Sequence, residues 1–207
     1  MRWLVGTIGA VAVVAVLVAC VPTPASSETP SPPPTTSTPT SEPTATPTGS
    51  PTEDPAGVTI PECDALLSLA TARSVLGEST ELIPSTATPV EAMPDPATVA
   101  AAEAASQAEL CTWAIPNSDG GFIVVVAELD AVAAADLTAA LRADASLVEG
   151  TVAGAMSFTG ELDSVLGTTS VTHLLDGAIW VMVNGTIDVT SSPVIAAEVL
   201  VNTRATS

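Results

Sequence analysis

The sequence predicts an α+β domain in residues 58–207, with an antiparallel sheet of about four to five strands built from two hairpins and covered by helices. Three observations lead to this class. A short helical segment opens the domain, two pairs of apolar segments are each joined by a turn sequence, and each pair is followed by a segment with helical capping and periodicity. Because short turns join antiparallel strands, this order predicts an antiparallel sheet.

The first part of the domain predicts helices and a loop. Residues 63–67 predict a short helical turn, and residues 69–76 predict a second helix that a serine caps and a glycine ends. Prolines spread through residues 84–98 predict a surface loop. Residues 97–109 are rich in Ala and Glu, which favours a helix. Its apolar face lacks large side chains, so we expect this helix to pack weakly.

The first hairpin consists of strands 110–115 and 122–129, joined by a turn rich in Asn, Ser, Asp and Gly. Alternation along the first strand places Cys111 and Trp113 on the same face. A helix over residues 131–145 follows, and the aspartate before it is a suitable N-cap. This segment therefore supplies two strands and one covering helix.

The second hairpin consists of strands 168–175 and 178–184 around the turn Asp176-Gly177, in which both residues need positive φ. Residues 155–159 are a candidate for a further strand before it. A last helix over residues 193–203 begins with a proline, and the serine before it is the expected cap. The end of the chain thus repeats the order of hairpin and helix.

The second hairpin also predicts a candidate binding face. Its turn pairs His173 with Trp180, and Met182 lies on the same face. The opposite face of the hairpin is equally apolar, and a sheet with two apolar faces needs a cover on each. Two interpretations stay open. These three side chains pack in an ordinary core, or they line a partly open apolar groove that accepts a hydrophobic ligand or a segment of a partner protein.

The start of the chain indicates export. A short, weakly positive segment precedes an apolar run that extends to residue 19, which is typical of a secretory signal peptide. An uncleaved membrane helix is the alternative. At Leu17-Val18-Ala19-Cys20 the sequence resembles the lipobox of bacterial lipoproteins. This resemblance implies that residues 1–19 are removed and that Cys20 becomes an N-terminus carrying acyl chains such as palmitate. The expected location is the outer, extracellular face of the cytoplasmic membrane.

Residues 20–57 predict the link between this anchor and the folded domain. Behind Cys20, Pro, Ser and Thr make up most of the stretch, and large apolar side chains are almost absent. Such a composition buries too little surface to fold and favours extended polyproline II. At about 3.1 Å per residue the stretch reaches about 115 Å when fully extended. We therefore expect a stalk that holds the domain away from the membrane.

The cysteine count predicts one disulfide. The chain contains three cysteines. With Cys20 assigned to the lipid by the lipobox resemblance, Cys63 and Cys111 remain, and an exported protein normally pairs them. A metal site is the rival interpretation, but two thiols and the single histidine of the chain cannot complete a four-ligand Cys/His cage. We therefore expect a Cys63–Cys111 disulfide and no bound metal.

A second resemblance concerns the folded part of the chain. The segments Cys63-Asp64-Ala65-Leu66-Leu67, Leu76-Gly77 and Cys111-Thr112-Trp113 are similar to an uncharacterised two-cysteine domain of lipoproteins from high-GC Gram-positive bacteria. This resemblance also implies that the two cysteines pair. It implies no particular function.

The charge of the chain excludes some partners. The formal net charge is −19, and the sequence contains no lysine. A field of this sign repels phosphate backbones and anionic lipid headgroups, so we expect no nucleic-acid partner and no direct binding to lipid surfaces. The simplest interpretation is that the charge keeps an Ala- and Val-rich chain soluble. Cation binding is the alternative, although no calcium loop of the usual pattern is present in the sequence.

The sequence gives no catalytic motif. It contains no Gly-x-Ser-x-Gly elbow, no phosphate-binding glycine loop and no His-Glu-x-x-His segment. His173 is the only histidine, so a triad would have to use it. We predict a membrane-anchored, non-enzymatic lipoprotein without cofactor, whose domain binds a hydrophobic ligand or an envelope protein. The alternative is a hydrolase that acts on envelope material through His173.

Overall fold

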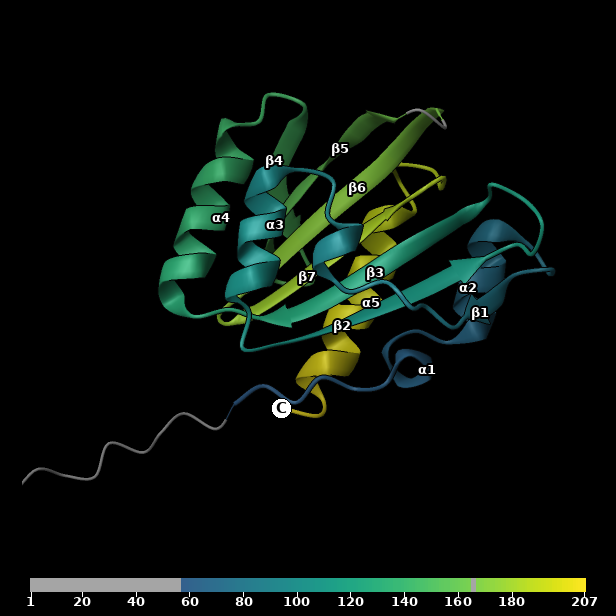
Figure 1. The fold of residues 1–207 in the computed structure, drawn as a ribbon, viewed down its shortest axis with the longest axis horizontal. Helices are drawn as coiled ribbons and strands as arrows, with labels where there is room; N and C mark the ends of the chain where they lie inside the picture. Colours follow the sequence, from purple (N-terminus) through teal and green to yellow (C-terminus); the bar gives the residue numbers. More distant parts are fainter. Residues whose placement is uncertain (1–56, 165–166) are drawn as a thin grey trace, which may run out of the picture. The chain divides into compact units, whose positions relative to one another are not determined.

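The computed structural model of the chain describes residues 57–164 and 167–207, which form an α+β unit around one seven-stranded sheet (Figure 1). All strand pairs are antiparallel, in the order β1-β2-β3-β7-β6-β5-β4. The strands are β1 (Glu81–Ile83), β2 (Gln107–Ala114), β3 (Gly121–Glu128), β4 (Leu147–Val152), β5 (Ala155–Ser164), β6 (Gly167–Asp176) and β7 (Ile179–Gly185). The helices are α1 (Cys63–Leu66), α2 (Leu69–Leu76), η1 (Val90–Ala92), α3 (Pro96–Ala104), α4 (Ala131–Ala143) and α5 (Ser192–Arg204).

The predicted signal peptide, Cys20 and the stalk up to residue 56 lie outside the described residues. Among the helices that the structure describes, none has the length and apolar character needed to cross a bilayer.

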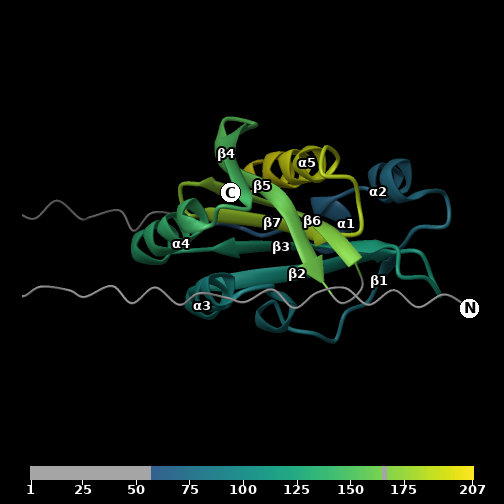
Figure 2. The same cartoon turned by 90° about the horizontal axis from the view of Figure 1, so that it is seen from above.

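Helices cover both faces of the sheet. Figures 1 and 2 show α3 and α4 on one side of the strands and α5 on the other, together with α1 and α2. The central strand β7 shows why two covers are needed, because Val181 and Val183 pack toward α5 while Trp180 and Met182 pack toward α3 and α4. All four side chains are fully buried. Each face therefore has its own apolar core, as expected for a strand that is hydrophobic on both sides.

The core on the α5 side is tied to β2 by the disulfide. Cys63 at the start of α1 is bonded to Cys111 on β2, with an S–S distance of 2.07 Å. On the same face of β2, the ring of Trp113 stacks on Phe122 of β3, with 5.5 Å between the ring centroids. The predicted pairing is confirmed, and so is the prediction of an α+β fold with an antiparallel sheet.

The prediction of four to five strands is wrong, because the sheet has seven. The candidate strand at residues 155–159 is present but continues to Ser164 as β5. The sequence did not predict its neighbour β4. Most side chains of β4 are exposed, and its sequence therefore lacks the alternation of apolar and polar residues that indicates a strand. The turn between them uses Ala153 and Gly154, with φ of 50° and 80°. Alanine rarely adopts positive φ, so the sequence did not indicate this turn.

The prediction of a helix over residues 97–109 is also wrong for its last five residues. The helix α3 ends at Ala104, and β2 begins at Gln107, which pairs with Glu128 of β3. Pairing with β3 overrides the helical propensity of these residues, which is only a few tenths of a kcal/mol each. The N-terminus of α3 is fixed by Asp95, whose carboxylate accepts the backbone N–H groups of Ala97 and Thr98.

The turn of the second hairpin is shifted by one residue from the prediction. Asp176 pairs with Ile179, so the two turn residues are Gly177 and Ala178, and of the two only Gly177 has positive φ, at 60°. A Gly at the first turn position is typical of a type II′ turn, whereas the predicted type I′ turn needs two residues with positive φ. His173 consequently pairs with Met182 rather than with Trp180. The side chains of His173, Trp180 and Met182 still lie on one face. The partner of His173 changes by two positions, and alternate residues of a strand point to the same face.

The predicted caps of two helices are confirmed. Ser68 accepts a backbone N–H group of α2, and Asp130 accepts two from α4. The third prediction is wrong, because Ser192 is the first residue of α5 rather than its cap. Its hydroxyl is buried and donates to the hydroxyl of Thr172 on β6, at 2.9 Å. This contact orients the start of α5 on the sheet.

Removal of the disulfide should destabilise this fold. Replacing Cys63 and Cys111 together by Ser frees a loop that the bond closes over 48 positions, and the chain-entropy model gives a loss of about 4 kcal/mol. Urea unfolding followed by tryptophan fluorescence measures this loss. The Cys20→Ser variant is the control and should unfold like the parent chain. An unchanged midpoint for the double variant would show that the cross-link does not stabilise the domain.

Candidate functional site

The predicted binding residues lie on the face of the sheet that α3 and α4 cover. His173 on β6 is 2% exposed, and Trp180 and Met182 on β7 are fully buried. The indole Nε1 of Trp180 donates a hydrogen bond to Nδ1 of His173, at 3.4 Å, and the two rings are stacked with 6.2 Å between their centroids. The structure therefore brings these side chains together, but in the core.

The expected apolar groove along these residues is closed. Ala101 and Ala102 of α3 and Leu137 and Leu141 of α4 pack in the same cluster as Trp180. Ala101 and Ala102 are both buried, so the weak packing expected for this segment does not leave the face open. The helices of the domain cover both faces of the sheet. Of the two interpretations of His173, Trp180 and Met182, ordinary core packing is the one that agrees with this burial.

The bond to Trp180 fixes the protonation pattern of His173. An indole N–H can only donate, so Nδ1 of the imidazole must be the acceptor. The neutral ring then carries its proton on Nε2. Burial lowers the pKa of His173 from 6.5 to about 4, against the attraction of the nearby Asp95 and Asp144 carboxylates. At neutral pH the side chain is therefore uncharged, with Nε2 as a donor.

The imidazole lines a small cavity of about 40 Å³ between the start of α3 and the end of α4. Asp95, the N-cap of α3, and Asp144, the residue after α4, line the same cavity. Its volume is sufficient for one water molecule but for no organic ligand. The imidazole is therefore not accessible to an organic ligand in this conformation.

A larger cleft of about 400 Å³ lies next to this cavity and shares Asp95, Asp144 and Leu162 with it. Asp163 near the end of β5 and Asn184 near the end of β7 also line the cleft. A third hollow of about 290 Å³ shares Thr169 and Asn184 with the cleft and continues over the mainly apolar start of β3, including Ile123. Figure 1 shows that the strands extend beyond α3 and α4.

Electrostatics distinguish the cleft from the buried face. Hydrogen bonds from the hydroxyl and the backbone N–H of Ser146 lower the pKa of Asp144, so this carboxylate is ionised at neutral pH. The arginines of the described residues are engaged elsewhere: Arg73 with a backbone carbonyl, Arg142 with Glu149 and Arg204 with Asp176. Within the described part of the chain, no cationic side chain neutralises the carboxylates of the cleft.

Sequence reasoning did not find this cleft. Asp95, Asp144 and Asp163 come from a helix start, a helix end and a strand end that are far apart in the chain. The pair Asp95-Pro96 is a recognisable helix start, so one of the three could have been found as a cap. Their convergence depends on how α3 and α4 pack on the sheet, which no local pattern encodes.

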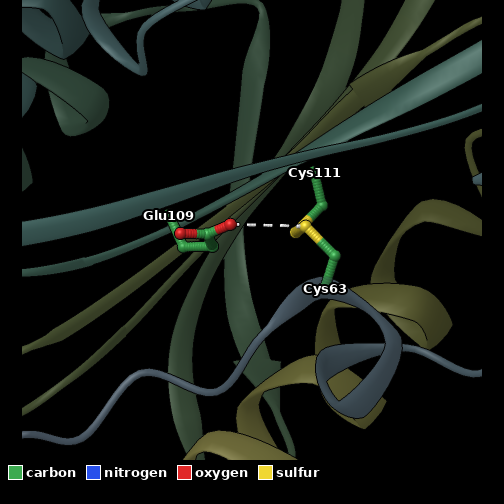
Figure 3. A group of neighbouring side chains, drawn as sticks. All are labelled: Cys63, Glu109 and Cys111. Atoms are coloured by element: carbon green, nitrogen blue, oxygen red, sulfur yellow. Dashed lines mark hydrogen bonds between the residues drawn. A yellow bond between two sulfur atoms is a disulfide. The ribbon is translucent and has the colours of Figure 1, made fainter. Parts of the chain in front are cut away.

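A second group of side chains has the chemistry of metal ligands. Figure 3 shows Cys63, Glu109 and Cys111, and their ligand atoms lie within 4.8 Å of one another. The two sulfurs are bonded to each other, so in this state neither is the thiolate that a metal would need. Glu109 Oε1 lies 3.4 Å from Cys63 Sγ, and burial together with the charge of Glu62 raises the pKa of Glu109. Its carboxylate lies beside the disulfide as a close contact, because the sulfur has no proton to donate.

No family model matches the chain, and comparisons with curated proteins and with solved structures find no similar protein.

The buried histidine should make the fold sensitive to acid. The unfolded chain binds the proton with a pKa near 6.5 and the folded chain with a pKa of about 4, so the unfolded state holds more protons between these values. The free energy of unfolding should fall by up to about 3 kcal/mol as the pH drops through this window. In His173→Asn, whose side-chain oxygen can still accept from Trp180, this part of the pH dependence should vanish. Urea unfolding between pH 7.5 and 4 measures it, and an equally steep decline in the variant would contradict the assignment.

Proposed function

We propose that the chain is a lipid-anchored extracytoplasmic lipoprotein, whose domain binds a ligand or partner at the cell envelope without catalysing a reaction. The observation that carries the proposal is the pairing of Cys63 with Cys111. This disulfide uses two of the three cysteines, so Cys20 has no other cysteine of its own chain with which to pair. A disulfide is also expected of a domain in an oxidising compartment. Cys20 stands at the end of the apolar segment, where the lipobox resemblance requires a thiol for lipidation.

We place the binding site at the cleft between Asp95, Asp144 and Asp163 rather than at the buried face of His173. The carboxylates favour a ligand group with positive charge, since none of them is paired with an arginine of the described residues. The adjoining hollow over Ile123 offers apolar surface. A ligand with a cationic group and an apolar portion matches both parts.

The tautomer of His173 weighs against the hydrolase alternative. A general base in a triad receives the proton of the nucleophile on one ring nitrogen, while the other nitrogen donates to a carboxylate. In this domain Nδ1 accepts from Trp180, so Nε2 already carries a proton. The cavity beside the ring also has room for about one water molecule only. This geometry supports a structural task for His173.

The anchor can be tested directly. Mass spectrometry of the membrane-extracted protein should find an N-terminal peptide that begins at Cys20 and carries an acyl-glyceryl group. The Cys20→Ser variant, which lacks the thiol, should lose this modification. The double variant Cys63→Ser/Cys111→Ser is the matched control and should stay lipidated. A free thiol at Cys20, or an N-terminus at Met1 in the mature protein, would remove the basis of the proposal.

The cleft can be tested with octylamine, a probe that combines a cationic group with an apolar chain. Nuclear magnetic resonance titration at low salt should show binding that the neutral analogue octanol does not match. The variant Asp144→Asn/Asp163→Asn should bind octylamine about tenfold more weakly, because it lacks two carboxylates that attract the ammonium group. A tenfold loss of affinity corresponds to about 1.4 kcal/mol, which is modest for two charges in a partly solvated cleft. The control Asp64→Asn/Glu78→Gln removes equal charge elsewhere and should bind like the parent. Equal weakening in both variants would mean that net charge, rather than the cleft, attracts the probe.

A further inference from the structure

The two edges of the sheet differ in their protection against pairing with another strand. At one edge, β1 has only three residues and is followed by Pro84. At the other edge, β4 has six residues and contains neither Lys nor Pro. Its single charged side chain, Glu149, is bound to Arg142 at 2.8 Å. Natural sheets usually protect long edges with charges, prolines or bulges, and β4 has none of these apart from a charge that is already paired.

The backbone of β4 presents unused hydrogen-bonding groups to solvent. The two-residue turn makes Val152 and Ala155 the closing pair of the β4–β5 hairpin, and such a pair exchanges both of its backbone bonds. The alternation of an antiparallel ladder then directs the N–H and C=O groups of Glu149 and Thr151 away from β5. The side chain of Val148 adds apolar surface at the same edge and is 72% exposed.

We propose that β4 pairs with β4 of a second copy of this chain, in antiparallel orientation, about a twofold axis through Gly150. The sheet then continues from one molecule into the other. Glu149 lies opposite Thr151 of the second copy and exchanges two backbone hydrogen bonds with it, and the twofold axis repeats this pair. This proposal does not depend on the lipid anchor or on the cleft.

The sequence of β4 favours this occupant and this register. Two identical strands keep their faces aligned only when odd-numbered residues meet odd-numbered residues, and the register about Gly150 fulfils this condition. It places Val148 opposite Val152 of the second copy, an apolar pair on one face. A register centred on Glu149 would place the two carboxylates directly opposite each other, which is destabilising.

Cross-linking of the full chain in its own membranes tests the register. Gly150→Cys places two thiols next to each other across the axis, and the added side chain meets only the hydroxyl of Ser157, at 3.2 Å, which can turn away. Mild oxidation should convert most of this variant to a covalent dimer. Val132→Cys is the matched control, because Val132 is 69% exposed and belongs to α4 rather than to the pairing strand. Equal cross-linking of both variants, or of neither, would overturn the proposal.

Light scattering of the detergent-solubilised full chain tests the partner. The parent chain should be dimeric at high concentration. Val148→Lys should weaken the dimer at least about tenfold, because it places a charge at the paired edge, while the circular dichroism spectrum stays unchanged. Val132→Lys introduces the same charge at a similarly exposed site and should dimerise like the parent. A monomeric parent chain, or an undiminished Val148→Lys dimer, would refute the pairing.

Discussion

The apolar character of both faces of the central strands is the constraint on which the rest of the structure depends. In β3, β6 and β7, side chains on either side of the strand are buried, so water must be excluded from both faces. The chain meets this need with two groups of helices from different parts of the sequence. Helices α1, α2 and α5 cover one face, and α3 and α4 cover the other.

The two covers are attached in different ways. On one side, the Cys63–Cys111 disulfide ties the short α1 to β2, and the large α5 packs with Ile195, Val199 and Leu200 against the sheet. A helix of four residues has little stability of its own, so the covalent bond compensates for its length. On the other side, α3 and α4 are rich in alanine, and their buried side chains belong to the same apolar cluster as Trp180.

This second cover explains why we propose a binding surface at the ends of α3 and α4 and not under the helices. Helices α3 and α4 bury His173, Trp180 and Met182, and leave Asp95 and Asp144 at their own ends. The same packing thus makes the histidine a neutral core residue and gathers carboxylates at the rim of an open cleft. The burial of His173 and the exposure of the carboxylates both depend on where α3 and α4 end. The proposed binding role rests on the carboxylates at this rim. The argument against catalysis rests on the burial of His173 in the core.

Local patterns predicted much of the fold, and the reason is visible in particular residues. Ser68 and Asp130 cap helices as their side chains suggest, Trp113 and Cys111 share a face through simple alternation, and the even number of remaining cysteines predicted their bond. Gly177 marked the second hairpin, although one residue of uncertainty in its turn changed the partner of His173. The local sequence alone does not specify whether Asp176 and Gly177 or Gly177 and Ala178 form the two-residue turn.

Other features were decided by the tertiary structure. Residues 107–109 have helical propensity but join β2, because hydrogen bonds and burial against β3 outweigh it. The edge strand β4 has an exposed surface without alternation, so only its pairing with β5 defines it. The meeting of Asp95, Asp144 and Asp163 arises from the docking of two helices on one sheet. The sequence by itself determined the capping, the alternation within strands and the cysteine pair, because these depend on neighbouring residues or on counting. The closed face and the open cleft depend on contacts between distant segments, and only the folded chain brings those together.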